Sequence, residues 1–217
     1  RRHPRTRIAP SVAPGLDWIG VMLPYAPMHH LLLDTADCPL VMTSGNLADE
    51  PIATGNDEAL QRLKGIADVF LLHDREILSR VDDSVVRLVD GTAVLMRRSR
   101  GYAPLPLRIP VPTPKPLVAV GPHLKNTFTL VRGNTAYVSP HIGDLEGVEG
   151  LAHFRATLDR YRELFRIEPR VVARDLHPGY LSTRIAGEMA LEREIAVQHH
   201  HAHIAAVIAE HGVKEKV

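Results

Sequence analysis

The feature that most constrains the fold is a proline-rich stretch near the middle of the chain, APLPLRIPVPTPKP at residues 103–116, which holds six of the 17 prolines. Proline fixes φ and lacks a backbone N–H, so this stretch is not expected to form a helix or a central strand. We predict a stiff, extended linker at 109–116 that separates a domain of residues 1–108 from one of residues 117–217. The alternative is a long edge loop within one domain.

Strands and helices alternate on the N-terminal side of this stretch. The pattern predicts three strands and two helices, at residues 18–23, 39–43 and 68–72 and at residues 27–35 and 57–64 respectively. The second helix is expected to have Asn56 as its N-cap. A hairpin is predicted from 84–89 and 92–97 around Asp90-Gly91, a dipeptide typical of type I′ turns.

The C-terminal side has the pattern of an α/β domain. Strands are expected at 117–120, 127–131, 135–139, 171–174 and 195–198, with a turn at 132–134 between the second and the third. Helices are expected over 182–191 and 199–210, the second closed by Gly212. An earlier helix follows from an apolar stripe of Leu151, Phe154, Leu158, Tyr161 and Phe165. The order β-β-β-α-β-α-β-α is typical of α/β folds.

Composition excludes several classes of protein. With 26 Lys and Arg against 25 Asp and Glu, the net charge is +1, so neither single-stranded nor double-stranded nucleic acid is expected as a partner. Cys38 is the only cysteine, which excludes an intrachain disulfide and a cysteine-based zinc finger. No apolar run approaches the roughly 18 residues of a membrane span. A reducing cytoplasm is the expected location, with no membrane partner.

Four segments carry polar residues suited to a nucleotide or phosphate. Ser44 and Asn46 flank Gly45 directly after a predicted buried strand, where α/β proteins bind ligands; the alternative is a plain β-turn. Arginines in RVDDS (80–84) and RRSR (97–100) could clamp a phosphate, or could form a solvated rim of ion pairs. The turn GPHLKN (121–126) offers backbone N–H groups and Lys125, but lacks the Walker spacing and also fits a tight hairpin with an exposed lysine.

The histidine-rich segment VQHHHAH at 197–203 predicts a metal site. On a helix, His199 and His203 lie four residues apart and project from one face, so both can bind one metal ion. Position 200 is His rather than Glu, which excludes the HExxH metalloprotease motif. A further ligand must come from elsewhere, because zinc and iron sites need at least three protein ligands. The alternative is a structural histidine cluster at the start of an apolar helix.

Taken together and in order, these motifs resemble the HypF carbamoyltransferases, which help to build the nickel–iron centre of hydrogenases. The matching stretches are GVMLPYAPMHHLLL (20–33), PLVMTSGNLADEPI (39–52), LLHDREILSRVDDSVVR (71–87), RRSRGYAP (97–104), LKNTFTLVRG (124–133), HIGDLEG (141–147), DLHPGYLSTR (175–184) and VQHHHAHIAA (197–206). The resemblance implies that residues 1–108 are the C-terminal part of a YrdC-like domain. It implies that residues 117–217 are the N-terminal half of an actin-like transfer domain.

The resemblance also implies a function and site residues. Family members form carbamoyl-adenylate from carbamoyl phosphate and ATP with Mg²⁺, and transfer the carbamoyl group to the C-terminal cysteine of a partner, HypE. The residues carried over for nucleotide binding are Ser44, Asn46, Arg80, Ser84, Arg100, Lys125 and Asn126. His199 and His203 match the HxxxH pair for one mononuclear iron or zinc ion, whose acidic ligand is expected from a second half of the domain. The chain is accordingly expected to be an internal piece of a longer enzyme, incomplete by itself.

Two other functions fit parts of the pattern. Both domain types have relatives that make or transfer threonylcarbamoyl for tRNA, although the balanced charge disfavours an RNA partner. A non-catalytic metal-binding module could use the 13 histidines, of which only four lie in the cluster at 199–203.

Overall fold

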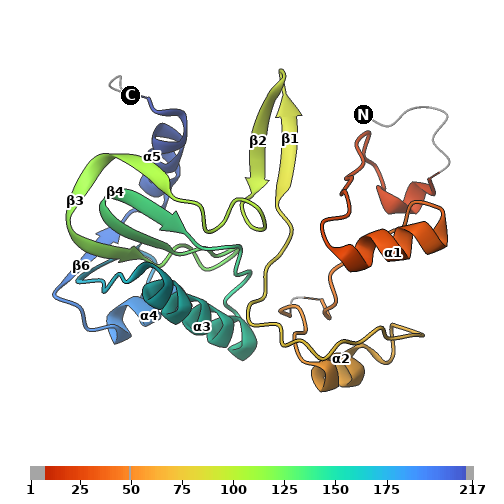
Figure 1. The fold of residues 1–217 in the computed structure, drawn as a ribbon. Helices are drawn as coiled ribbons and strands as arrows, with labels where there is room; N and C mark the ends of the chain where they lie inside the picture. Colours follow the sequence, from red (N-terminus) through yellow and green to blue (C-terminus); the bar gives the residue numbers. More distant parts are fainter. Residues whose placement is uncertain (1–7, 49, 214–217) are drawn as a thin grey trace. The chain divides into compact units, whose positions relative to one another are not determined.

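A four-stranded sheet organises residues 45–217, the larger of the two units into which the chain divides (Figure 1). The computed structural model describes residues 8–48 and 50–213. The sheet has the order β4-β3-β5-β6, formed by β3 (Leu107–Ala119), β4 (Thr129–Val138), β5 (Val171–Asp175) and β6 (Arg193–Val197). β3 pairs antiparallel with β4 and parallel with β5, which in turn pairs parallel with β6. The α/β class is thus confirmed.

Helix α3 (Val148–Phe165) connects β4 to β5, and α4 (Leu181–Glu188) connects the parallel strands β5 and β6. Both helices pack against the sheet and form the hydrophobic core with it. The predicted apolar stripe of α3 is confirmed, since Phe154, Leu158 and Tyr161 are all buried. At the centre of the core, the fully buried ring of Phe128 meets the rings of Phe154 and Tyr161 edge-on, with centroid distances of 5.5 and 5.3 Å. Apolar burial of this kind is the main stabilising contribution to such a domain.

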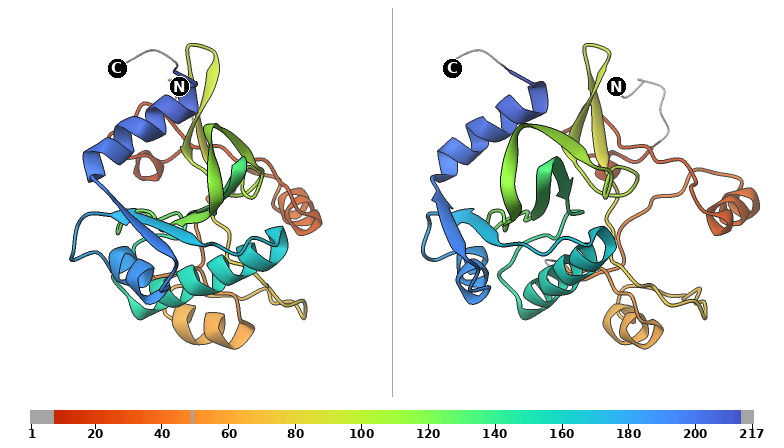
Figure 2. Two further views of the ribbon diagram at one scale, coloured as in Figure 1. Left: turned by 90° about the vertical axis from the view of Figure 1, so that its left-hand side faces the viewer. Right: turned by 60° about the vertical axis from the view of Figure 1, so that its left-hand side comes forward.

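A third helix, α5 (His199–His211), lies on the opposite side of the sheet from α3 and α4 (Figure 2). It begins directly after β6 and ends at Gly212, whose positive φ of 60° closes the helix as the sequence predicted. None of its residues is buried, and Ile204 and Val207 are each 54% exposed. The histidines of its first turn are therefore accessible.

The proline-rich stretch is extended, as predicted, but it is a strand of the sheet rather than a linker. Most of it belongs to β3, which pairs with β4 from Leu107 onward and with β5 only from Leu117 onward. The prolines at 110, 112, 114 and 116 alternate along the strand. Because successive N–H groups point to opposite edges of a strand, the missing donors all fall on one edge, which leaves the other edge free to pair with β4.

The turn predicted at 132–134 is wrong. β4 runs without interruption from Thr129 to Val138, so the two strands expected at 127–131 and 135–139 are one. Gly133 has a φ of 61° and pairs with Thr113, where the register between β3 and β4 shifts on both sides. Glycine here accommodates a β-bulge, which bends a strand without ending it.

The hairpin predicted before the proline-rich stretch is confirmed. β1 (Val85–Val89) pairs antiparallel with β2 (Thr92–Arg97). The linking residues Asp90 and Gly91 have φ values of 48° and 78°, and positive φ at both central residues is the requirement of a type I′ turn.

The remaining elements are α1 (Pro27–Ala36), α2 (Asn56–Leu63) and a short 3₁₀ turn, η1 (Pro10–Val12). The helix predicted at 57–64 thus begins one residue early, with Gly55 rather than Asn56 as its N-cap. The side chain of Asn56 instead donates a hydrogen bond to the carbonyl of His73 at 2.7 Å.

The strands predicted at 18–23, 39–43 and 68–72 are not formed, although all three segments are described. Each contains a valine that is at least 71% exposed (Val21, Val41 and Val69), so no neighbouring strand or helix covers the apolar side chains that favoured the prediction. No helix within the described part of the chain is long and apolar enough to cross a membrane.

Candidate functional site

The histidine pair predicted to bind a metal forms at the carboxyl ends of β5 and β6. Gln198 follows β6 in an extended conformation and is the N-cap of α5, so His199 is the first helical residue and His203 lies one turn later. The Nε2 atoms of the two rings are 3.1 Å apart. Two bonds of about 2.0–2.1 Å to one tetrahedral ion would place two nitrogens about 3.3 Å apart. The pair therefore has the spacing of two adjacent ligands of one ion.

Asp175, the last residue of β5, orients this pair. It lies opposite Val197 in the β5–β6 register, two residues before His199. Its Oδ2 lies 2.5 Å from Nδ1 of His199, while its Oδ1 accepts a hydrogen bond from the backbone N–H of His177 at 2.8 Å. With the carboxylate on Nδ1, the proton of a neutral His199 is held there and the lone pair of Nε2 faces His203.

The carboxyl group of Asp175 is poorly solvated, with a side-chain exposure of 8% against 47% for His199. Burial raises its pKa, but hydrogen bonds from the His177 backbone and from His199 outweigh burial, so that the pKa is lowered overall. Asp175 is therefore ionised at neutral pH and accepts both hydrogen bonds.

A stack of rings surrounds this cluster. Tyr180, the N-cap of α4, stacks on His177 with a centroid distance of 4.2 Å and on His123 at 5.4 Å. His123, in the loop after β3, also accepts a hydrogen bond from the backbone N–H of Leu181 at 3.4 Å. These contacts hold the loop that follows Asp175. The aspartate at the end of β5 and the two histidines of α5 therefore come from two elements.

Only two ligands of a metal ion are identified among the described residues. Asp175 approaches the Nδ1 side of His199, away from the Nε2 atoms, and so orients a ligand rather than being one. Within residues 8–48 and 50–213, no group of three or more histidine, cysteine, aspartate or glutamate side chains is placed to hold an ion. The pair fits a zinc or iron site to which a further ligand is added from outside the described residues.

Ser44 and Asn46 belong to different units of the chain. Ser44 is exposed at the end of the first unit. Asn46 is half-buried, and its amide donates to the carbonyls of Leu47 and Glu50 at 2.8 and 2.9 Å. Its Oδ1 is buried and has no hydrogen-bond partner among the described residues, which leaves one acceptor of this side chain available.

The structure brings Ser84 and Arg100 together. The hydroxyl of Ser84 donates to the carbonyl of Arg100 and accepts from the backbone N–H of Ser99, both at 2.8 Å. The Arg100 guanidinium pairs with Asp83 at 3.1 Å and donates to the Val81 carbonyl at 3.0 Å. These bonds join the segment before β1 to the segment after β2.

Arg80 lies against α2. Its Nε donates to the Ile52 carbonyl at 2.6 Å, and its guanidinium lies 3.5 Å from the Glu58 carboxylate. Arg80 thus forms an ion pair with Glu58, as expected if the arginine-rich segments form ion pairs rather than a phosphate clamp.

The turn that contains Lys125 and Asn126 has two different environments. Asn126 is fully buried, and its amide donates to the carbonyls of Val120 and Pro122 at 2.9 and 2.6 Å, so it holds the turn together. Lys125 has a φ of 48°, and its backbone N–H donates to Asp144 at 2.6 Å, while its side chain is exposed. Gly121 permits the tight turn, because a Cβ there would lie 2.0 Å from the Thr127 carbonyl oxygen.

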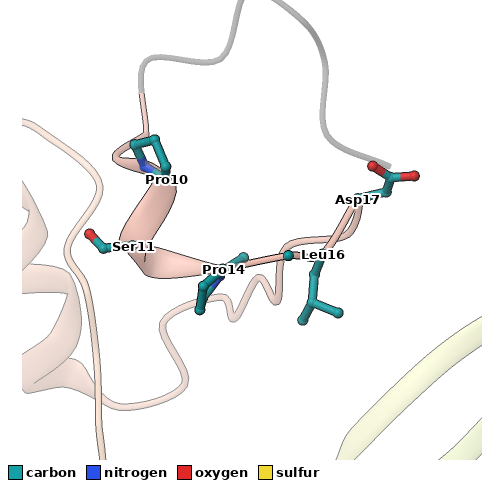
Figure 3. Close-up of a pocket in the computed structure, with 7 residues that line it drawn as sticks. Pro10, Ser11, Pro14, Leu16 and Asp17 are labelled. Atoms are coloured by element: carbon teal, nitrogen blue, oxygen red, sulfur yellow. The ribbon is translucent and has the colours of Figure 1, made fainter.

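A separate hollow in the first unit is lined by Pro10, Ser11 and residues 13–17 (Figure 3). Its lining comes from one continuous loop that contains η1, with Ser11 and Asp17 as the polar side chains. Ligand sites are generally built from polar groups that converge from several elements, which this hollow lacks.

Sequence reasoning identified the histidine pair but not the link to Asp175. Asp175 and His177 lie in the matching stretch DLHPGYLSTR (175–184), at a strand-to-helix loop where a site could form, but no contact with the histidine pair was predicted. The signal was present in the order of elements: two neighbouring parallel strands end at Asp175 and at Val197, so the residues that follow them meet at one edge of the sheet.

Two family models match the chain side by side. The model described as "HypF Kae1-like domain" matches residues 112–210, and the model described as "Telomere recombination" matches residues 1–99. A curated relative, the carbamoyltransferase HypF of Synechocystis, is 49% identical over 206 residues, which is 95% of this chain and 27% of the relative.

Solved structures agree. A full-length HypF in the phosphate- and nucleotide-bound form matches with a TM-score of 0.86 and 50% identity, over 92% of this chain and 31% of that one. The T. kodakarensis HypF matches with a TM-score of 0.89 and 41% identity, over 98% of this chain and 28% of that one. The chain spans little more than a quarter of the length of these relatives, and over that span it belongs to the HypF family.

Proposed function

We propose that the chain is part of an ATP-dependent carbamoyltransferase that acts in the maturation of nickel–iron hydrogenases. The observation that carries this proposal is the 49% identity to a carbamoyltransferase HypF over 95% of the chain. The two family models follow one another along the chain in the order expected for an adenylating part and a transferring part.

In the first part of the proposed reaction, water cleaves carbamoyl phosphate to carbamate and inorganic phosphate in another part of the complete enzyme. A carbamate oxygen then attacks the α-phosphorus of ATP, which is supplied as its Mg²⁺ complex. Carbamoyl-adenylate forms and pyrophosphate leaves. The residues proposed to take part in nucleotide binding are those that the family resemblance carries over: Ser44, Asn46, Arg80, Ser84, Arg100, Lys125 and Asn126. Support comes from Asn46, whose buried Oδ1 lacks a partner among the described residues and can accept a hydrogen bond from a ligand.

In the second part, the thiolate of a C-terminal cysteine on a HypE-like acceptor attacks the carbamoyl carbon, and AMP leaves. His199 and His203 are proposed as two ligands of one iron or zinc ion, which when bound supplies a Lewis acid. Asp175 holds the proton of His199 on Nδ1, and Tyr180 and His177 stack to fix the loop that follows Asp175.

A chimera tests the proposal. The 206 aligned residues of the Synechocystis relative are replaced by those of this chain, and the chimera is incubated with carbamoyl phosphate, ATP, Mg²⁺ and the cognate acceptor. We expect mass spectrometry to find the acceptor's C-terminal cysteine carbamoylated. The matched control carries Asn46→Ala, for which we expect weaker ATP binding and slower product formation. A correctly folded chimera that never modifies the cysteine refutes the proposal.

A further inference from the structure

The side chain of Glu58 connects α2 to the segments before and after this helix. Glu58 is the third residue of α2, and its Oε2 accepts hydrogen bonds from the backbone N–H groups of Thr54 and Gly55 at 3.1 and 3.3 Å. These contacts form a capping box, in which an acidic side chain accepts from N–H groups at the start of a helix. One oxygen of the carboxylate is thereby committed to the residues directly before α2.

The other oxygen of this carboxylate reaches two arginines. Oε1 of Glu58 accepts a hydrogen bond from Nη1 of Arg62 at 2.5 Å and lies 3.5 Å from Nη2 of Arg80. Arg62 also pairs with the carboxylate of Glu50. Nε of Arg80 donates to the Ile52 carbonyl at 2.6 Å. Because the glutamate and the two arginines are only 22–29% exposed, water screens their contacts less than those of a surface ion pair.

Asn46 is held at the far end of this network. Its amide donates to the carbonyl of Glu50 at 2.9 Å, so Glu50 is bound by Asn46 at its backbone and by Arg62 at its side chain. The backbone N–H of Ala53 donates to the carbonyl of Gly45 at 3.0 Å. The backbone on the two sides of Asn46 is thereby joined.

A path of direct contacts therefore leads from Glu58 to Asn46. It passes from the Glu58 carboxylate to Arg62, from there to Glu50, and from the Glu50 carbonyl to the Asn46 amide. Oδ1 of Asn46 is buried and has no hydrogen-bond partner within residues 8–48 and 50–213. Such an acceptor can receive a hydrogen bond from a ligand only while its amide group is held in the right orientation. The residues that hold the amide therefore affect how well the ligand binds.

The carboxyl group of Glu58 is ionised at neutral pH. Burial raises its pKa, but hydrogen bonds from the backbone N–H groups of Thr54 and Gly55 act in the opposite direction. The hydrogen bond from Arg62 and the charge of Arg80 add to them, so that the pKa is lowered overall. A carboxylate accepts at both oxygens at once, and its hydrogen bonds are stronger than those between neutral groups. Only the anion can hold all four partners together.

We propose that Glu58 is a positioning residue for ATP: through these contacts it holds Asn46, so that Oδ1 of Asn46 accepts a hydrogen bond from the bound nucleotide. The inference rests on the proposed function, in which Asn46 takes part in nucleotide binding. A residue that only caps α2 would act on the free energy of unfolding. A positioning residue acts on the affinity of the folded protein for ATP, and the two roles are therefore separable by experiment.

The test is the exchange of pyrophosphate with ATP, dependent on carbamoyl phosphate, in the chimera with the Synechocystis relative. In Glu58→Gln the side chain keeps one acceptor oxygen for the capping box, but its NH₂ group faces the two arginines and the link to them is lost. The KM for ATP should rise about 3–10-fold at a nearly unchanged kcat, since a misdirected hydrogen bond loses most of its contribution to binding. The matched control is Asp57→Asn, which removes the same charge from an exposed position on the same turn and should leave both constants unchanged.

A double-mutant cycle shows whether Glu58 acts through Asn46. If it does, the variant with both Asn46→Ala and Glu58→Gln should have no higher KM for ATP than Asn46→Ala alone. Two effects that simply multiply in the double variant overturn the proposal, as does an unchanged KM in Glu58→Gln.

A lower kcat at an unchanged KM in Glu58→Gln would mean that less of the protein is folded, so that Glu58 is a helix cap only, and this also overturns the proposal. In each of these cases the exchange itself persists, and the proposed function stands. Absence of exchange in the chimera that keeps both residues refutes the adenylating role, and this inference falls with it.

Discussion

Replacing Asp175 by asparagine is expected to weaken metal binding, although the two side chains have nearly the same shape. Asp175 accepts two hydrogen bonds at once, from the backbone N–H of His177 and from Nδ1 of His199. An asparagine has one acceptor oxygen and one NH₂ group, so it can satisfy only one of these donors. If its oxygen stays with the backbone, its NH₂ faces Nδ1 and the proton of His199 must move to Nε2, where the metal lone pair is needed.

The expected loss is about 10–100-fold in metal affinity, the usual cost of removing a carboxylate behind a histidine ligand. This corresponds to about 1.4–2.7 kcal/mol of binding free energy. The value belongs toward the upper end, because the carboxylate is only 8% exposed and water replaces it poorly.

The assay is a competition titration of Zn²⁺ against a chelator at neutral pH, for the wild type, Asp175→Asn and Asp175→Ala. Asp159→Asn is the matched control, an exposed aspartate on α3 that pairs with Arg162 at 3.2 Å. Thermal unfolding of the metal-free proteins separates a change in folding from a change in the site. Wild-type zinc affinity in Asp175→Asn would refute the reasoning.

Three further predictions concern stability, each measured by urea unfolding. Burial, with Arg80 and Arg160 nearby, lowers the pKa of His153 from 6.5 to about 4. Between pH 6.5 and pH 4 the unfolded state therefore binds more protons than the folded state. The free energy of unfolding is expected to fall by about 3 kcal/mol as the pH drops through this range. His153→Gln should remove this part of the pH dependence, and an unchanged slope would contradict the assignment. Gly150→Ala should destabilise the protein by about 1–3 kcal/mol despite the higher helix propensity of alanine, because the new Cβ would lie 2.5 Å from the Asp144 carbonyl oxygen. Its control is Gly187→Ala, where a Cβ meets nothing within 4 Å, and which should stabilise the protein by up to about 1 kcal/mol. Similar effects at both positions would count against the contact with Asp144. Phe128→Ala should lower the free energy of unfolding by about 3–5 kcal/mol, because its ring is fully buried and packs against two aromatic rings. Leu164→Ala, at a position 61% exposed, should lower it by under about 1 kcal/mol. Equal losses would show that Phe128 is not at the centre of the core.

Local patterns predicted those elements whose stability is decided locally or by a single apolar face. The stripe of α3, the type I′ turn at Asp90-Gly91 and the glycine that ends α5 were each read correctly, because propensity and burial agree at these places. The helices at 27–36 and 181–188 were found within a few residues for the same reason.

Predictions failed where pairing with a distant strand decides the conformation. The prolines of β3 argued for a linker, but an antiparallel partner needs donors on one edge only, and the alternation of prolines keeps that edge intact. Gly133 was expected to mark a turn, and only the presence of β3 makes it a bulge within β4. The segments at 18–23, 39–43 and 68–72 have strand-like composition, yet they have no partner strand in the described part of the chain.

The candidate site was predictable in part. The spacing of His199 and His203 predicted the pair on one helical face, because a helix fixes that geometry locally. The contact to Asp175 depends on the register of β5 with β6, which the spacing of residues does not contain. Lys125 and Asn126 were grouped by sequence, but the turn buries one and exposes the other, so their roles separate.

The most direct test of the proposed function compares the two partial reactions in the chimera and in its His203→Ala variant. Exchange of pyrophosphate with ATP, dependent on carbamoyl phosphate, reports adenylation, and mass spectrometry of the acceptor cysteine reports transfer. We predict that His203→Ala retains the exchange and loses the transfer together with the bound metal. If the variant transfers the carbamoyl group as fast as the chimera that keeps His203, the assignment of the histidine pair to the carbamoyl-transfer site is contradicted.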